Sequence, residues 1–162
     1  MREVSYTHTI DAPLERVIDA YRSAEFYAAK QKHSGAYTVE ILEEEELPGG
    51  KRRMVARVEE PTRVPPFLRR SDVDVFEDES LLDPERGELT WKITPGTAAD
   101  VFFVSGRVGF EAAGEQTRVT FTTRIEVKIP LLGKKAEKIG VEKIEAETAQ
   151  QAEFIRKWLS EG

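Results

Sequence analysis

The chain has 162 residues, which is a length that suits one domain. Its 24 Lys and Arg residues face 30 Asp and Glu residues, and the net charge of -6 argues against nucleic acid as the main partner. The absence of cysteine excludes disulfides, thiol catalysis and cysteine-based zinc sites. No window approaches about 18 apolar residues and no apolar leader opens the chain, so we expect a soluble cytoplasmic protein.

The first third of the chain predicts one strand followed by two short helices. Polar and apolar residues alternate over residues 4–10, as in a half-buried strand. Asp11 stands at an N-cap position, and Pro13 would lie in the first turn of a helix. Ser23 is placed to cap a second helix, which would end at Gly35.

A two-residue period then continues for almost a hundred residues, and short turns interrupt it. We predict six strands at about 36–46, 51–60, 70–79, 87–95, 101–112 and 116–129. Their short connections favour an antiparallel meander. The last thirty residues predict one long amphipathic helix, because apolar and small residues recur at helical spacing at Ala136, Gly140, Ile144, Thr148, Ala152, Ile155 and Leu159.

Charges on the predicted strands alternate in sign from one strand to the next. The expected outward residues are Glu40, Glu44 and Glu46 on the first of these strands, Arg53 and Arg57 on the second, and Asp72, Asp74 and Asp78 on the third. Opposite charges across neighbouring strands stabilise a sheet modestly. The simpler interpretation is that these are solvated charges.

The order of elements resembles that of the START-like (SRPBCC) superfamily, which includes the birch pollen allergen and polyketide cyclases. The residues that carry the resemblance are 5–13, 129–135 and 154–159. It implies an α+β helix-grip fold over residues 1–162 as a single domain. That fold has a seven-stranded curved antiparallel sheet, two short helices and a long C-terminal helix. The chain's ending is similar to a branch of unknown function, so the resemblance implies a cavity but supplies no catalytic residue.

The long helix changes in side-chain size along its length. Its first half offers Gly133, Ala136 and Gly140 to the sheet, whereas its second half offers Trp158 and Leu159. Glycine is costly in a helix, so it suggests either vacant space or close approach of the backbone. We expect a hollow beneath the glycine-bearing half. The alternative is that Gly133 belongs to a turn and Gly140 permits tight packing.

Strand parity gives a mostly apolar lining for this hollow, which suits a hydrophobic ligand. The residues expected to contact the ligand are Tyr6, His8, Tyr37, Met54, Val75, Trp91, Phe102, Phe110, Thr123, Ile144 and Thr148. Apolar residues in three loops at one end of the sheet would form the cavity mouth. The mouth residues are expected to be Phe67, Leu68, Leu131 and Leu132, with His33 nearby.

Basic residues flank two of these loops. Arg63, Arg69 and Arg70 lie beside the first loop, and Lys134 and Lys135 lie beside the last. Loops 61–70 and 130–135 could therefore make a peripheral contact with an anionic membrane. The alternative is that the loops pack on themselves and the lysines are ordinary solvated residues.

Three functions are consistent with the sequence. The first is noncatalytic binding, transport or sensing of a lipid-like or aromatic molecule. The second is a cyclase- or dehydratase-like enzyme that uses His8 or a tyrosine for proton transfer. The third is a protein-interaction module whose outward Val101 and Phe103 form an apolar sheet face. His8 and His33 have no carboxylate at ligand spacing, so we expect no metal and no cofactor. The oligomeric state stays open.

Overall fold

A computed structural model describes residues 1–161 of the chain. Its elements begin with β1 (Arg2–Ile10), α1 (Leu14–Arg22), α2 (Ala24–His33), β2 (Thr38–Glu46) and β3 (Arg52–Pro61). They continue with β4 (Val73–Asp83), β5 (Glu88–Pro95), β6 (Phe102–Ala113), β7 (Gln116–Val127) and the long helix α3 (Gly133–Glu161). Two short 3-10 turns, Pro48–Gly50 and Pro66–Leu68, lie between the strands.

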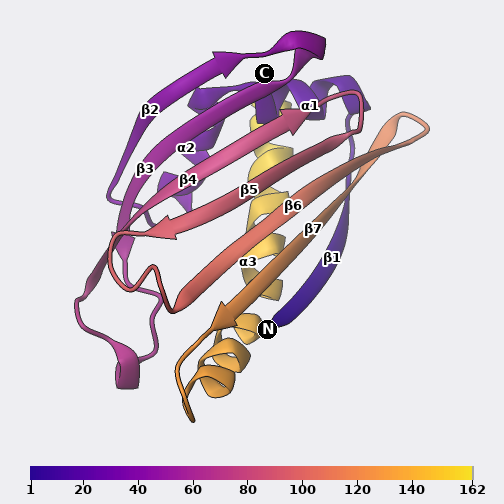
Figure 1. The fold of residues 1–162 in the computed structure, drawn as a ribbon. Coiled ribbons are helices and arrows are strands. Elements are labelled where there is room, and N and C mark those ends of the chain that lie inside the picture. Colours follow the sequence, from indigo (N-terminus) through magenta and orange to yellow (C-terminus); the bar gives the residue numbers. More distant parts are fainter. Residues whose placement is uncertain (162) are drawn as a thin grey trace.

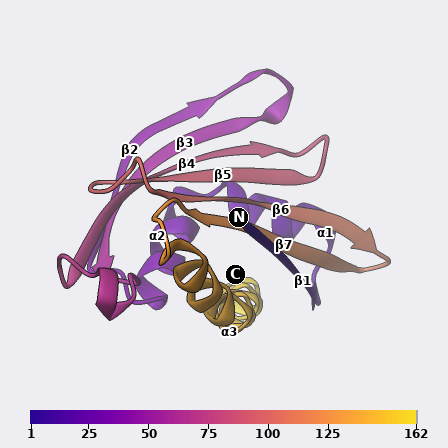
Figure 2. The same cartoon turned by 60° about the horizontal axis from the view of Figure 1, so that its bottom comes forward.

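The seven strands form one antiparallel sheet in the order β1-β7-β6-β5-β4-β3-β2. The predicted meander is thereby confirmed, and β1 closes it by pairing with β7. The sheet curves around one side of α3, while α1 and α2 lie at the far end of the same side (Figures 1 and 2). This is the predicted α+β helix-grip fold.

Local sequence signals place the two short helices, with one correction. The Ser23 hydroxyl accepts a hydrogen bond of 3.2 Å from the backbone N–H of Phe26, so Ser23 caps α2 as expected. Helix α1 begins one residue after Pro13, which is itself the N-cap and has no side-chain cap. The prediction that Asp11 caps α1 is therefore wrong, because the fixed φ of Pro13 already starts the turn.

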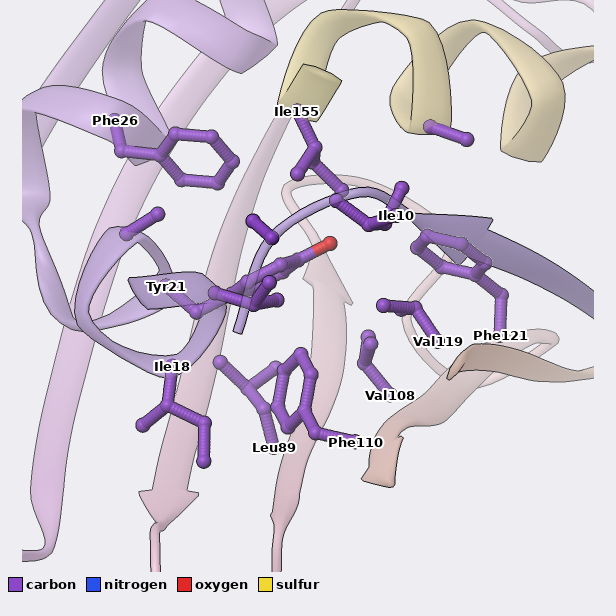
Figure 3. Close-up of a cluster of buried hydrophobic side chains, with 14 of the residues drawn as sticks. Ile10, Ile18, Tyr21, Phe26, Leu89, Val108, Phe110, Val119, Phe121 and Ile155 are labelled. Carbon is purple, nitrogen blue, oxygen red and sulfur yellow. The ribbon is translucent and has the colours of Figure 1, made fainter. Parts of the chain in front are cut away.

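The main hydrophobic core lies between α1, the second half of α3 and strands β5 to β7 (Figure 3). Tyr21 occupies its centre, with its ring 5.2 Å from that of Phe26 and 4.9 Å from that of Phe110. Trp158 packs edge-on against Phe26 at 5.4 Å. The large residues in the second half of α3 therefore fill the interior between α3, α1 and the sheet.

Strand β4 buries the face opposite to the one that its first residues predict. Its register pairs Phe76 with Val58 and Leu82 with Arg52, so the even-numbered residues from Phe76 to Leu82 point inward. Asp78 is 7% exposed and Asp74 is half-buried, which overturns their predicted outward positions. The short Val–Asp alternation at 72–75 was misleading because Phe76 and Leu82 decide the face by burying larger surfaces.

A bulge between Ile41 and Glu43 corrects the predicted face of β2 in the same way. Beyond it Glu44 and Glu46 pair with the inward-facing positions Met54 and Arg52 instead of lying on the outer face. The expected pattern of acid, base and acid does occur across the outer face, but with other partners. Arg53 contacts Glu43 of β2 at 2.9 Å and Glu79 of β4 at 3.4 Å.

Candidate ligand-binding cavity

A cavity of about 1430 Å³ lies between the concave face of the sheet, α2, α3 and the segment 61–72. Helix α3 packs most closely on β1 and β7, at one edge of the sheet. This position leaves space between α3 and the middle strands, which the cavity occupies. Figure 2 shows α3 on the β1 and β7 side of the sheet. The apolar wall of the cavity consists of Met54, Phe76, Trp91, Ile93, Phe102, Val104, Ile125 and Ile144.

The glycines of α3 do not create this space, contrary to our expectation. A Cβ atom at Gly140 would lie 2.7 Å from Cδ1 of Ile125, and one at Gly133 would collide with the carbonyl oxygen of Val127. Both glycines thus permit close contact between α3 and β7, which was the alternative interpretation. The hollow results instead from the position of α3 at the sheet edge.

Gly106 of β6 shapes the floor of the cavity. It lies opposite Trp91 of β5 in the strand register, and a Cβ atom there would come within 2.5 Å of Cζ2 of the indole. The same Cβ atom would collide with the backbone oxygen of Thr122. The missing side chain lets the Trp91 ring lie across the neighbouring strand, where it forms part of the apolar wall.

A polar cluster lies where α2 crosses β3 and β4. The Tyr27 hydroxyl donates a hydrogen bond of 2.8 Å to Oδ2 of Asp78 and accepts one of 3.0 Å from Nε2 of Gln31. Burial raises the pKa of Asp78 even though the Tyr27 hydrogen bond, Lys30 and Arg52 favour its charged form. Oδ1 of Asp78 is buried without a hydrogen-bond partner among residues 1–161.

Two cations accompany this carboxyl. Lys30 of α2 lines the cavity, and burial lowers the pKa of its ammonium group. Arg52 of β3 is 1% exposed and donates hydrogen bonds of 3.3 Å to the carbonyls of Tyr21 and Arg22 and one of 3.1 Å to Ser80 Oγ. The hydrogen bonds of Arg52 thus connect the C-terminal end of α1 to the sheet, beside the polar cluster.

The segment 61–72 borders the open side of the cavity. The first residues of this segment are bound to Asp74 of β4. The Asp74 carboxylate accepts a hydrogen bond of 2.9 Å from the Thr62 hydroxyl and one of 3.1 Å from the Arg63 N–H. Arg63 forms ion pairs with Glu147 of α3 and with the buried Glu60. Exposed lining residues mark the opening, namely Phe67, Arg69 and Arg70 from the segment and Glu142, Lys143 and Gln150 from α3.

Seven of the residues predicted to contact the ligand border this cavity. They are Met54, Val75, Trp91, Phe102, Thr123, Ile144 and Thr148. Four others lie elsewhere. Tyr6 and His8 are on β1, at the sheet edge that α3 covers, and the His8 ring lies 6.1 Å from that of Phe121. Phe110 is part of the core, and Tyr37 is 60% exposed just before β2.

The residues predicted for the mouth separate into two groups. Phe67 and Leu68 border the cavity, but Leu131 and Leu132 do not, and Leu131 is 100% exposed. His33 at the end of α2 packs its ring 5.0 Å from that of Phe154. Val101 and Phe103, the two apolar residues predicted to point outward from the strand at 101–112, lie in different places. Val101 borders the cavity, while Phe103 lies on the outer face with Lys128 Nζ 4.8 Å from its ring centroid.

Sequence reasoning missed the polar cluster entirely. Tyr27, Lys30 and Gln31 lie on a helix without a strong apolar stripe, and Asp78 lies on the strand whose face was misassigned. The i and i+4 spacing of Tyr27 and Gln31 was the one available signal, since such residues are neighbours on a helix. Nothing in the sequence indicated that Asp78 would face them.

Within residues 1–161, no three His, Asp or Glu side chains gather as ligands of a metal ion would. In the same residues, no helix combines the length and apolar character needed to cross a bilayer.

Comparisons of structure place the fold among known proteins. The chain is similar to an aromatase/cyclase from Streptomyces sp. R1128, with 18% identity, a TM-score of 0.73 and coverage of 98% of this chain and 93% of that one. A START superfamily protein from Mycobacterium smegmatis has 18% identity, a TM-score of 0.65 and coverage of 98% and 97%. Norcoclaurine synthase from Thalictrum flavum, in complex with dopamine and hydroxybenzaldehyde, has 14% identity, a TM-score of 0.68 and coverage of 99% and 87%.

At these identities the likeness concerns the fold alone. No curated protein matches the chain in sequence. A family model does match residues 5–159, and its description is "Protein of unknown function (DUF2505)". The fold is that of the START-like superfamily, and the chain belongs to the DUF2505 family.

Proposed function

We propose that the protein binds a hydrophobic small molecule, lipid-like or aromatic, inside the cavity. The observation that carries this proposal is the volume of about 1430 Å³, which is bordered by many apolar side chains. Burial of apolar ligand surface would supply about 25 cal/mol per Å² before the costs of association. The polar cluster of Tyr27, Lys30 and Asp78 would orient the ligand by hydrogen bonding.

The fluorescent probe N-phenyl-1-naphthylamine tests this proposal, because it is apolar and uncharged. We expect saturable binding to the wild-type protein. Ile93 and Val104 are paired in the strand register and border the cavity. Replacing both with tryptophan should fill part of the cavity and weaken probe binding by about tenfold, which equals about 1.4 kcal/mol.

The matched control is Phe103→Trp, which adds an indole to the same strand on the outer face of the sheet. It should leave the dissociation constant unchanged. A wild-type protein that shows no saturable probe signal would refute cavity binding. Equal affinities for the wild type and the double variant would also count against it. Circular dichroism would verify that each variant keeps the wild-type fold.

An enzymatic role is the second candidate, and the hydrogen-bonded pair of Tyr27 and Asp78 favours it. Both residues border the cavity, so that either could exchange a proton with an enclosed substrate. His8, by contrast, does not border the cavity. Proton transfer in a cyclase-like reaction would therefore depend on Tyr27 rather than on His8.

We also propose that the two loops beside the cavity contact an anionic membrane during ligand exchange. Leu131 is fully exposed, and Phe67 and Leu132 are exposed as well. Lys135 connects the loops by placing Nζ 4.7 Å from the centroid of the Phe67 ring. The combination of exposed apolar side chains with adjacent lysines is suited to the surface of a bilayer that contains anionic lipids.

Flotation with vesicles that contain phosphatidylglycerol tests this membrane contact. The double variant Leu131→Glu, Leu132→Glu should lower the bound fraction several-fold, because it replaces apolar contacts with charges that the anionic lipid repels. Leu81→Glu is the control, since Leu81 is an exposed leucine on β4. Equal binding of the wild type and the double variant would contradict the proposal.

A further inference from the structure

Lys30 lies at the polar end of the cavity with its ammonium nitrogen unpaired. Nζ is 5.7 Å from the centroid of the Tyr21 ring and 5.5 Å from that of the Tyr27 ring. The described residues 1–161 offer this nitrogen no hydrogen bond and no ion pair, although Lys30 borders a cavity large enough for a ligand. The amine is therefore free to meet a molecule in the cavity.

The surroundings of Lys30 favour the neutral amine more than water does. Burial lowers its pKa, the charge of Asp78 opposes this effect, and the charge of Arg52 adds to it. A lysine desolvated in this way has a larger neutral fraction near neutral pH than a surface lysine. Only the neutral amine has the lone pair that makes nitrogen a nucleophile.

Asp78 is the carboxyl whose charge acts on this amine, although the two groups form no ion pair within residues 1–161. Its Oδ2 accepts the Tyr27 hydrogen bond, while Oδ1 has no partner among residues 1–161 and can hold a proton. Burial raises the pKa of Asp78, so that the protonated form extends toward neutral pH. Gln31 fixes Tyr27, and hence the orientation of the carboxyl, through its own hydrogen bond to the Tyr27 hydroxyl.

This inference rests on the proposed cavity function and specifies its ligand. We propose that the cavity takes an aldehyde or a ketone and that Lys30 forms an imine with the carbonyl carbon, with Asp78 as the proton donor. The apolar wall would hold the rest of the molecule, and the carbonyl group would lie at the polar end beside α2.

The reaction balances without any further reagent. The Lys30 lone pair forms a C–N bond while the C=O π electrons move to oxygen, and a proton passes from nitrogen to that oxygen to give a carbinolamine. Asp78 then protonates the hydroxyl group, water leaves, and the nitrogen lone pair forms the C=N bond. The products are a protonated imine, the Asp78 carboxylate and one water molecule. The new positive charge is formed beside the new negative charge, which stabilises both in a site of low dielectric constant.

Reductive trapping tests the imine directly. The full-length protein is incubated at neutral pH with 2-naphthaldehyde and sodium cyanoborohydride, and peptide mass spectrometry then locates the reduced adduct. We expect Lys30 to be labelled at least about tenfold faster than Lys32, which is exposed two residues away on the same helix. The preference for Lys30 should increase as the pH falls from 9 to 7, because exposed lysines lose their neutral fraction first.

Three variants make the test specific. Lys30→Met should abolish labelling at position 30 and leave only the slow labelling of Lys32 in α2. Lys30→Arg should do the same while keeping the positive charge beside Asp78, in case the methionine variant folds poorly. Asp78→Asn should slow labelling of Lys30, because the amide cannot donate the proton that releases water. Lys32→Met is the control and should leave the rate at Lys30 unchanged.

Parallel titration with N-phenyl-1-naphthylamine separates this inference from the cavity proposal. Saturable probe binding with equal labelling of Lys30 and Lys32 would overturn the imine and leave the cavity function intact. Preferential labelling of Lys30 without probe binding would support the reactive lysine and contradict the general hydrophobic cavity. Preferential labelling that persists unchanged in Asp78→Asn would overturn the assignment of Asp78 as the acid.

Discussion

Replacing Arg52 with methionine is expected to lower the free energy of unfolding by about 2–4 kcal/mol. The methionine side chain is similar in length but cannot donate to the carbonyls of Tyr21 and Arg22 or to Ser80. Buried acceptors left without a partner cost about 1–3 kcal/mol each. The carbonyls of Tyr21 and Arg22 end α1, so their loss of a donor should also loosen the attachment of that helix.

Urea unfolding followed by tryptophan fluorescence and circular dichroism measures this effect. Arg53→Met is the matched control, because Arg53 is the next residue of β3 but points to the outer face, where it pairs with Glu43 and Glu79. Such exposed pairs contribute little, so the unfolding midpoint of Arg53→Met should stay near that of the wild type. Two variants with the same midpoint would disprove the anchoring role of Arg52.

The substitution Gly106→Ala is expected to destabilise the protein by about 1–3 kcal/mol, which is the usual cost of an added methyl group in a closely packed site. Its Cβ would meet the Trp91 ring at 2.5 Å and would also collide with the Thr122 carbonyl. The ring must therefore tilt into the cavity or β6 must shift from β7. A changed emission maximum of Trp91 and weaker binding of N-phenyl-1-naphthylamine should accompany the loss of stability.

Gly109 provides the control on the same strand. An added Cβ there has only the Thr120 carbonyl oxygen nearby, at 4.0 Å, and the φ of Gly109 is not positive. Gly109→Ala should leave stability unchanged or raise it slightly, because alanine restricts the unfolded chain more than glycine does. If both variants lose the same stability, the loss is a general cost of alanine in β6, and the contact with Trp91 is not the cause.

The two glycines of α3 show how far sequence reasoning reached at the site. A glycine in a helix indicates either vacant space or close approach of the backbone, and the sequence allows both at Gly133 and Gly140. The choice between vacant space and close approach depends on what lies opposite the missing Cβ. Ile125 and Val127 lie there, and only the packing of α3 on β7 reveals them.

Asp78 shows a second limit of prediction from the sequence. Alternating residues identify two faces of a strand, but they do not say which face is buried when charged and apolar residues occur on both. In β4 the face was decided by pairing with β3 and β5, which places Phe76 and Leu82 inside and carries Asp78 with them. The chain accepts this buried carboxyl because Tyr27, Lys30 and Arg52 face it from α2 and β3.

Local patterns in the sequence were sufficient to predict the secondary-structure elements of this protein and their meander order. Two-residue periodicity, turn residues, the Ser23 cap and the amphipathic stripe of the last thirty residues specify their elements from neighbours within the chain, and the short links then allow little besides a meander. The cavity and its polar end were decided by the tertiary structure. They depend on where α3 rests on the sheet and on which residues distant in sequence become neighbours, and those contacts form only when the whole sheet curves around the helix.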